Sequence, residues 1–232
     1  MDSNNDKLLL EATGLCKSYG KRTIIKDADF RIYQGEIIAI VGPNAGGKST
    51  LLKILSGTSR PDSGTIRFEG NELKSASDFA THIGYIPQDN PLFEEMTVND
   101  NLKFWTSDVK GGYKKLTESG LIERMGLTPY LKYKVRRLSG GLKKRVSITC
   151  VISDSPKVLI LDEPGASLDV VFKEEIKNFL KAFRDEGGAV IIVSHEEGEL
   201  ALADRMYIMG ETELRQLERP VYAGELKELI TK

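Results

Sequence analysis

A nine-residue run constrains the fold of this chain more than any other feature. It satisfies the pattern G-x-x-x-x-G-K-[ST], in which glycines allow successive backbone N–H groups to turn inward on a polyphosphate. A branched apolar run, Ile37 to Val41, directly precedes it, and an apolar helical pattern from Leu51 to Leu55 follows. This context predicts a strand, a phosphate-binding loop and a helix, and favours them over a glycine-rich turn without a ligand. The run is Gly42, Pro43, Asn44, Ala45, Gly46, Gly47, Lys48, Ser49 and Thr50.

Two side chains of this loop have separate expected roles. Lys48 supplies a full positive charge near the terminal phosphates of a bound nucleotide, which adds to the partial charge of the helix N-terminus. Ser49 is the expected magnesium ligand, because a hydroxyl at this place in a phosphate loop commonly holds the metal. We therefore predict a site for a nucleotide and Mg²⁺.

Two acidic residues end a second apolar strand pattern, Val158 to Leu161. Asp162 at the end of this strand is placed to reach the magnesium of a neighbouring phosphate loop. Glu163 is expected to act as a general base that polarises the attacking water. Acids that follow a strand are more often solvated chain ends, but the phosphate loop strongly favours the functional interpretation.

The apolar patterns predict an α/β fold with a mostly parallel sheet. The runs at Ile37 to Val41, Val158 to Leu161 and Val190 to Val193 are typical of strands buried on both faces. Apolar residues at helical spacing from Phe172 to Phe183 predict a crossover helix before the third run. An additional antiparallel sheet is predicted near the N-terminus, from strand-like stretches at Leu8 to Glu11, Asp29 to Tyr33 and Thr65 to Glu69.

The chain is expected to form a single domain of 232 residues, in which 40% are apolar and supply a sizeable core. Residues 1–87 and 155–232 are predicted to form the P-loop core with its β subdomain. Residues 88–154 have a mixed, helical pattern and are predicted to form a small helical subdomain. His82 is expected at the surface, and apolar residues between 214 and 232 are expected to dock the C-terminal stretch on the body.

Composition excludes several classes of partner. Thirty-three basic residues against 34 acidic ones give a net charge of −1, so no basic excess favours nucleic acid. No apolar stretch approaches the roughly 20 residues that cross a bilayer, and the polar start lacks a secretory signal. A cytoplasmic location is expected, with Cys16 and Cys150 as inert thiols. Five basic residues are interpreted as a solvated rim: Arg136, Arg137, Lys143, Lys144 and Arg145.

With Leu138, Ser139, Gly140 and Gly141 upstream of the strand acids, the motif set resembles an ABC ATPase, the nucleotide-binding domain of ABC transporters. The resemblance covers nearly the whole chain. Taken singly, several of these side chains have ordinary structural explanations, but seven matches in the family's order favour function. In sequence order they are Tyr19, the P-loop, Gln88, the signature at 138–141, the pair Asp162 and Glu163, the D-loop at Ser167, Leu168 and Asp169, and His195 after Ser194.

The resemblance implies roles for the residues outside the P-loop. Tyr19 is expected to stack on the adenine ring. Gln88 is expected to contact magnesium and the attacking water, and His195 to contact the γ-phosphate. Together with Lys48 and Glu163, these two residues form the expected catalytic set.

The resemblance also implies a dimer. Residues Leu138 to Gly141 open a predicted helix, whose backbone donors and dipole suit an anion. That anion is expected to be the γ-phosphate of ATP held by a second subunit, identical or different. Asp169 and the rest of the D-loop are expected to couple the two sites.

The resemblance predicts an ATP-hydrolysing subunit that drives a separate membrane permease from the inner face of the cell membrane. The permease is expected to dock near Gln88 to Met96. Leu142 stands where many members have glutamine, and the basic run after it resembles the ABC-2-type exporters. The main alternative is a soluble ABC ATPase of the iron–sulfur cluster assembly type. A DNA-repair or translation-factor ABC protein and a regulator without turnover fit the sequence less well.

A second departure lies in the P-loop, where Ala45 and Gly46 reverse the order usual in the family. If Ala45 needs a positive φ, the expected strain is about 1 kcal/mol, which is too small to abolish binding.

Overall fold

A six-stranded sheet forms the centre of the protein. The computed structural model describes residues 7–108, 111–166, 168–218 and 220–221. Five strands of this sheet are parallel, and the strand at one edge, β10, is antiparallel to its neighbour. The strands lie in the order β10 (Glu213–Gln216), β9 (Arg205–Gly210), β3 (Ile37–Val41), β8 (Ala189–Val193), β7 (Val158–Asp162) and β6 (Ile83–Ile86). The three predicted core strands are therefore confirmed, and β3, β8 and β7 are adjacent.

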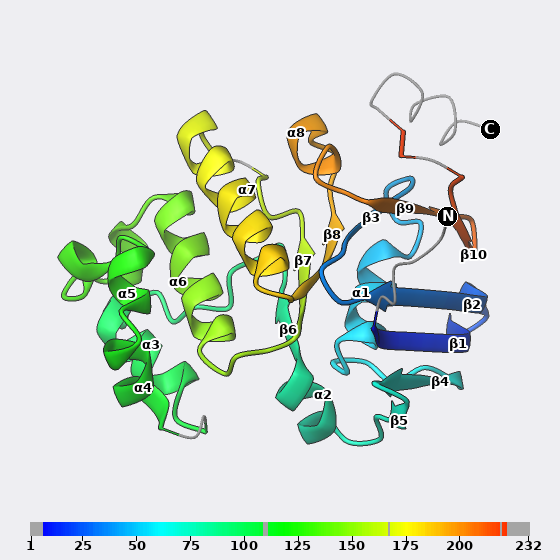
Figure 1. The fold of residues 1–232 in the computed structure, drawn as a ribbon, viewed down its shortest axis with the longest axis horizontal. Helices are drawn as coiled ribbons and strands as arrows, with labels where there is room; N and C mark the ends of the chain where they lie inside the picture. The colour runs from blue at the N-terminus through cyan, green and yellow to red at the C-terminus, as the bar shows by residue number, and fades with distance from the viewer. Residues whose placement is uncertain (1–6, 109–110, 167, 219, 222–232) are drawn as a thin grey trace.

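A four-stranded antiparallel sheet lies beside the central sheet (Figure 1). The prediction of β structure here is confirmed, but the first two strands are much longer than expected. Register shifts interrupt their pairing, and Gly14 and Asp27 have positive φ values, so the side-chain alternation is broken within each strand. The strands lie in the order β2 (Arg22–Tyr33), β1 (Leu8–Tyr19), β4 (Ser63–Phe68) and β5 (Asn71–Glu72).

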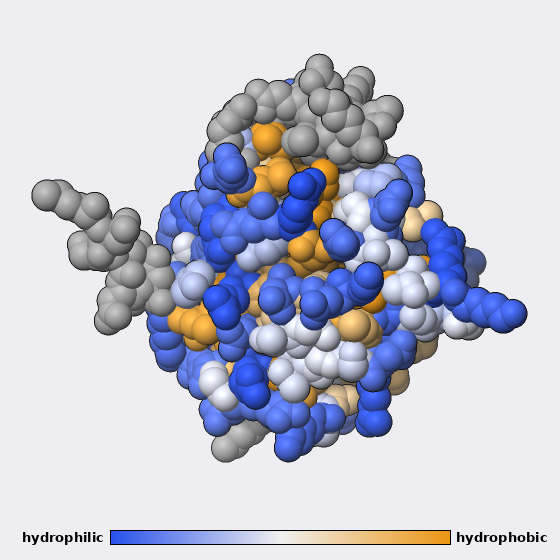
Figure 2. Space-filling view, turned by 90° about the vertical axis from the view of Figure 1, so that its right-hand side faces the viewer, coloured by the Kyte–Doolittle hydropathy of each residue, from blue (hydrophilic) through white to orange (hydrophobic). Residues whose placement is uncertain are grey.

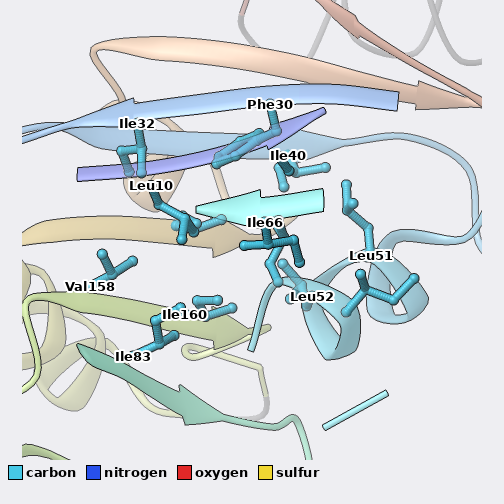
Figure 3. Packing of buried hydrophobic residues seen from close by; sticks show 14 of the residues in the cluster. Leu10, Phe30, Ile32, Ile40, Leu51, Leu52, Ile66, Ile83, Val158 and Ile160 are labelled. Atoms are coloured by element: carbon cyan, nitrogen blue, oxygen red, sulfur yellow. The ribbon is translucent and has the colours of Figure 1, made fainter. Parts of the chain in front are cut away.

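Helix α1 (Lys48–Leu55) packs in the main apolar core together with side chains from both sheets (Figure 3). Leu51 and Leu52 of this helix are fully buried, as are Phe30 of β2 and Ile40 of β3. Burying large apolar side chains is the main favourable term in folding, at roughly 25 cal/mol per Å². This core therefore fixes the helix that begins inside the phosphate loop.

Two longer helices cover the opposite face of the central sheet (Figure 1). They are α6 (Gly140–Ile152) and α7 (Val170–Asp185), with the short α8 (Glu197–Leu200) nearby. Ile148 of α6 and Ile176 and Leu180 of α7 belong to the apolar cluster on this face. The predicted crossover helix between β7 and β8 is thus confirmed as α7.

The helical part of the chain has an apolar cluster of its own, which includes Val98, Leu102, Leu116 and Val146. Its elements are α3 (Val98–Trp105), α4 (Gly112–Glu118), α5 (Leu121–Arg124), two 3₁₀ turns (Thr128–Tyr130 and Val135–Arg137) and α6. Helix α2 (Ala76–His82) precedes β6 and lies outside this group.

The surface differs from expectation at His82. This side chain is half-buried, and its ring stacks on Phe68 with centroids 4.1 Å apart, because it lies where the end of α2 meets β4. Viewed from the side of the antiparallel sheet, the protein surface is mainly hydrophilic, with smaller apolar areas between polar side chains (Figure 2). No helix in the described ranges is long and apolar enough to cross a membrane.

The structure describes Cys150 and only the beginning of the C-terminal stretch. Cys150 is buried, and burial raises the pKa of its thiol to about 12, so the reactive thiolate is disfavoured. Leu217, in the C-terminal stretch, packs against the apolar cluster between the central sheet and helices α6 and α7. Most of the C-terminal stretch, from residue 222 onward, lies outside the described residues.

Candidate active site

A pocket of about 610 Å³ lies where β3, β7 and β8 end. It brings together six of the predicted groups: Tyr19, most of the P-loop, Gln88, Asp162, Glu163 and His195. The side chains come from separate segments that only the parallel sheet places side by side, since the carboxyl ends of parallel strands meet at one edge. The full lining is Tyr19, Arg22, Ile24, residues 44–50, Gln88, Asp162, Glu163, Ala166, Val193 and His195.

The lysine of the phosphate loop forms hydrogen bonds with the backbone of the same loop. Lys48 is only 7% exposed, and its Nζ donates to the carbonyl oxygens of Gly42 (2.8 Å) and Pro43 (2.9 Å). An ammonium group has three donors, so these two bonds leave a third for a phosphate oxygen. Burial lowers the pKa of Lys48, and the negative charges of Glu163 and Asp162 oppose this effect.

The ends of the loop need glycine. Gly42 has φ of 148°, and a Cβ there would collide with the carbonyl oxygen of Met209; Gly47 has φ of 100°. Ala45 has φ of 59°, in the left-handed region, so the strain expected from the sequence is present. Its cost is about 1 kcal/mol, which local folding offsets easily.

The two strand acids lie in different environments. Asp162 ends β7 and is 5% exposed. Glu163 follows with a φ of 48°, a strained conformation for a side chain of this size, and its backbone N–H donates to the carbonyl oxygen of Val193 (2.9 Å). This backbone conformation directs the chain away from the strand immediately after Asp162. Sequence reasoning gave no indication of this strain.

Glu163 and His195 form a close pair. His195 Nε2 lies 3.4 Å from Glu163 Oε1. Burial, and then the charge of Asp162, raise the pKa of Glu163, while burial and Lys48 lower the pKa of His195. The lowered pKa favours the neutral imidazole, which can donate or accept a hydrogen bond.

The three predicted magnesium ligands have the chemistry that Mg²⁺ prefers. Ser49, Gln88 and Asp162 come from α1, the segment after β6 and the end of β7, and all three line the same pocket. They offer a hydroxyl, an amide and a carboxylate oxygen, and Mg²⁺ prefers oxygen ligands with few carboxylates and several waters. The donor set thus suits magnesium bound together with nucleotide phosphates.

Tyr19 lies at the edge of the pocket, at the end of β1. Its side chain is exposed (54%), and Lys17 Nζ is 5.5 Å from the ring centroid. Tyr19 is therefore not a core residue. An exposed ring at the mouth of a phosphate pocket is able to stack on a base.

The signature residues and the described D-loop residues, Leu168 and Asp169, do not line this pocket. Ser139 is the N-cap of α6, and its Oγ accepts from the N–H of Leu142 (3.3 Å). Gly140 is exposed, and a Cβ added there would meet only Leu168 Cδ2, at an ordinary 3.6 Å. Asp169 is the N-cap of α7, and its Oδ1 accepts from the N–H of Phe172 (3.0 Å); Ser167 lies outside the described residues.

Comparison with known proteins identifies the family. The family model described as ABC transporter matches residues 25–166, which is more than half of the chain. The chain belongs to the ABC transporter family. It is therefore an ATP-binding and ATP-hydrolysing transporter subunit of the P-loop NTPase fold.

Named relatives agree with this assignment. The lantibiotic transport ATP-binding protein SrtF of Streptococcus pyogenes is 39% identical over 197 residues, which is 84% of each chain. The linearmycin resistance ATP-binding protein LnrL of Bacillus subtilis is 35% identical over 89% of this chain and 68% of its own length. The structure of CbiO1 from Clostridium perfringens, part of an ABC transporter complex, superposes with a TM-score of 0.80 at 29% identity, covering 98% of this chain and 92% of CbiO1. The iron–sulfur cluster alternative finds no support in these matches.

One buried carboxyl near the site was not predicted from the sequence. Glu199 on α8 is 2% exposed, and neither of its oxygens makes a hydrogen bond with a described residue. It packs under the loop that follows Glu163, because a Cβ at Gly165 would collide with Glu199 Oε1. Burial raises the pKa of Glu199, and Glu163 and Glu196 act in the same direction. The nearby Ser194 and Lys173 oppose this rise only in part.

Replacing Glu199 with glutamine is expected to stabilise the fold at pH 8, because the neutral amide avoids the cost of burying a carboxylate charge. A carboxyl whose folded pKa is raised binds more protons folded than unfolded, so stability falls as pH rises above the ordinary value of 4.5. The variant should lose this part of the slope in urea unfolding between pH 5 and 8. Glu197→Gln, an exposed position on the same helix, should leave the slope unchanged. A slope in Glu199→Gln equal to that of the native chain would contradict the assignment.

Proposed function

We propose that two such subunits hydrolyse Mg-ATP at composite sites between them and drive a separate membrane permease at the cytoplasmic face of the membrane. One observation carries the proposal. The P-loop, both strand acids and His195 line one pocket, whereas the signature at 138–141 lies at the beginning of α6, where Ser139 and Gly140 are exposed, and does not line that pocket. A backbone anion site without a phosphate of its own implies a phosphate from another subunit.

We propose the following division of roles within the pocket. Lys48 and the P-loop backbone bind the phosphates, and Ser49, Gln88 and Asp162 bind magnesium, which neutralises phosphate charge when present. Glu163 accepts the proton of the attacking water, and the neutral His195 holds a hydrogen bond at the terminal phosphate. Tyr19 stacks on adenine, and the D-loop around Asp169 couples the two sites. Residues 88–154 act as the helical subdomain that carries the signature.

The permease contact that we propose lies directly after Gln88 and on α3. Phe93, Phe104 and Trp105 are 43%, 49% and 40% exposed, and their rings contact one another with centroids 4.7–6.0 Å apart. The buried Asn101 fixes Phe93, since it accepts from the Phe93 N–H (2.8 Å) and donates to its carbonyl oxygen (3.0 Å). A preorganised exposed aromatic group of this kind is typical of a protein interface. This aromatic surface extends the predicted docking segment, residues 88–96, to α3.

Co-purification with the permease tests this proposal. Glu163→Gln, isolated from the native host in mild detergent with Mg-ATP, is expected to retain a multi-spanning membrane protein in stoichiometric amount. Adding Phe104→Ser and Trp105→Ser should reduce the recovered amount at least tenfold. The matched control is Tyr133→Ser, another exposed aromatic position (51%), which should recover the native amount. Recovery of a soluble scaffold protein instead would overturn the transport part of the proposal.

We further propose that the chain belongs with the exporters of the ABC-2 type. The signature is followed by Leu142 and a basic run, as in that subgroup, and two of its relatives are named for lantibiotic transport and linearmycin resistance. An antibiotic-like amphipathic compound is therefore the class of cargo to test first with the recovered permease.

A further inference from the structure

A buried lysine joins the signature helix to the segment that contains Gln88. Lys144 of α6 is only 3% exposed, and its Nζ donates to the carbonyl oxygens of Pro87 (3.1 Å) and Gln88 (3.3 Å). The interpretation of Lys144 as part of a solvated rim is therefore wrong. The neighbouring Lys143 is less buried, with 23% of its side chain exposed, and pairs with Glu94 (2.6 Å).

A second side chain of α6 contacts the same segment. Ser147 is 3% exposed, and its Oγ lies 3.1 Å from Asn90 Oδ1, to which it donates. Ser147 follows Lys144 by three residues, so both side chains lie on one face of the helix. The two contacts hold the segment 87–90 at both ends, through two backbone carbonyls and one side chain.

Stability alone does not account for a lysine at this position. A buried ammonium group loses hydration that an apolar side chain of the same length does not need, so burial lowers the pKa of Lys144. The negative charges of Asp162, Asp89 and Glu199 oppose this effect. The bonds of the lysine to Pro87 and Gln88 thus specify a position rather than add apolar burial.

We propose that Lys144 and Ser147 are positioning residues that make the Gln88 segment and α6 move together. Displacement of Gln88 by the nucleotide or the permease then shifts Ser139 and Gly140, since these residues begin the same helix one turn before Lys144. The inference rests on the proposed function, in which Gln88 acts at one ATP and the signature at that of the partner. The coupling between Gln88 at one ATP and the signature at the other is thus assigned to the side chains of Lys144 and Ser147.

The test separates nucleotide binding from dimer closure. Lys144→Met keeps an unbranched side chain of nearly the same length and removes its three donors. In a Glu163→Gln background, its affinity for a fluorescent ATP analogue should stay within twofold of the parent. The protein concentration for half-maximal Mg-ATP-dependent dimerisation, measured by analytical ultracentrifugation, should rise at least tenfold. Hydrogen exchange at residues 88–90 should become faster. Lys143→Met, which removes the same charge from a partly exposed position of α6, should change none of these quantities.

Each other outcome has a definite meaning. Dimerisation and hydrogen exchange in Lys144→Met equal to those of the Glu163→Gln parent would overturn the proposal. If that variant does not fold, Ser147→Ala decides, since it removes only the bond to Asn90 and should weaken dimerisation two- to fivefold with faster exchange at residue 90. Unchanged values in Ser147→Ala would then overturn it. Failure of the Glu163→Gln parent itself to dimerise would contradict the proposed function instead, and hydrogen exchange at residues 88–90 would still test the contact between α6 and the Gln88 segment.

Discussion

Replacement of Glu163 by glutamine is expected to lower ATP turnover at least 100-fold while ATP binding persists. General-base catalysis contributes typically 10²–10⁴-fold, and the amide cannot accept the proton of the attacking water. Glu163 lies in the pocket with the P-loop, and its Oε1 is 3.4 Å from His195 Nε2. Its backbone N–H donates to the carbonyl oxygen of Val193, which fixes the position of the residue. The amide has the same shape as the acid, so the loop should keep its conformation. The rate of phosphate release measures turnover, and equilibrium nucleotide binding on the same preparation measures ATP affinity.

A matched variant shows whether the effect belongs to this carboxyl. Glu197→Gln removes an exposed acid on α8 beyond the pocket and should keep native turnover. The same preparation of Glu163→Gln should also accumulate as a dimer with Mg-ATP, because closure without hydrolysis leaves the nucleotide between the subunits. More than a tenth of native turnover in Glu163→Gln would sink the assignment of Glu163 as the general base.

The parts of the site that could be predicted from the sequence are those carried by local order. The P-loop needs its glycines, its lysine and its flanking strand and helix within about 20 residues, and these fix the fold around it. Asp162 and Glu163 follow a strand whose apolar run is unmistakable, so their placement at the sheet edge also follows from spacing. The parallel order of β3, β8 and β7 then brings His195 to the same pocket.

The parts that could not be predicted depend on packing between distant segments. Lys144 lies in a basic run, and only the position of α6 against the segment after β6 shows that it is buried. Glu199 belongs to an acidic stretch, and its burial follows from the contact of α8 with Gly165. The lengths of β1 and β2 were missed because bulges break the period-two pattern that identifies strands. Burial of a charged side chain is a tertiary property without a local pattern.

Replacement of Gly140 by glutamate is expected to abolish turnover, by 100-fold or more, without loss of ATP binding to the single subunit. Gly140 begins α6, where the free N–H groups and the helix dipole favour an anion. A carboxylate there would occupy these donors and repel the γ-phosphate of the partner. Because the signature does not line its own pocket, nucleotide affinity of the isolated chain should stay within twofold. Titration with a fluorescent ATP analogue and Mg-ATP-dependent dimerisation measure the two properties separately.

The structure provides reasons to expect a folded variant and a fair control. A Cβ at position 140 would meet only Leu168 Cδ2, at 3.6 Å, among the atoms of the described residues, so the glutamate side chain can be accommodated without a clash at its Cβ. Thr117→Glu adds the same charge at an exposed position of α4 in the helical part and should keep native turnover and dimerisation. If Gly140→Glu binds ATP and hydrolyses it at the native rate, the phosphate cannot lie against this helix. The composite site would then be wrong, and Glu163 would have to act within a single subunit.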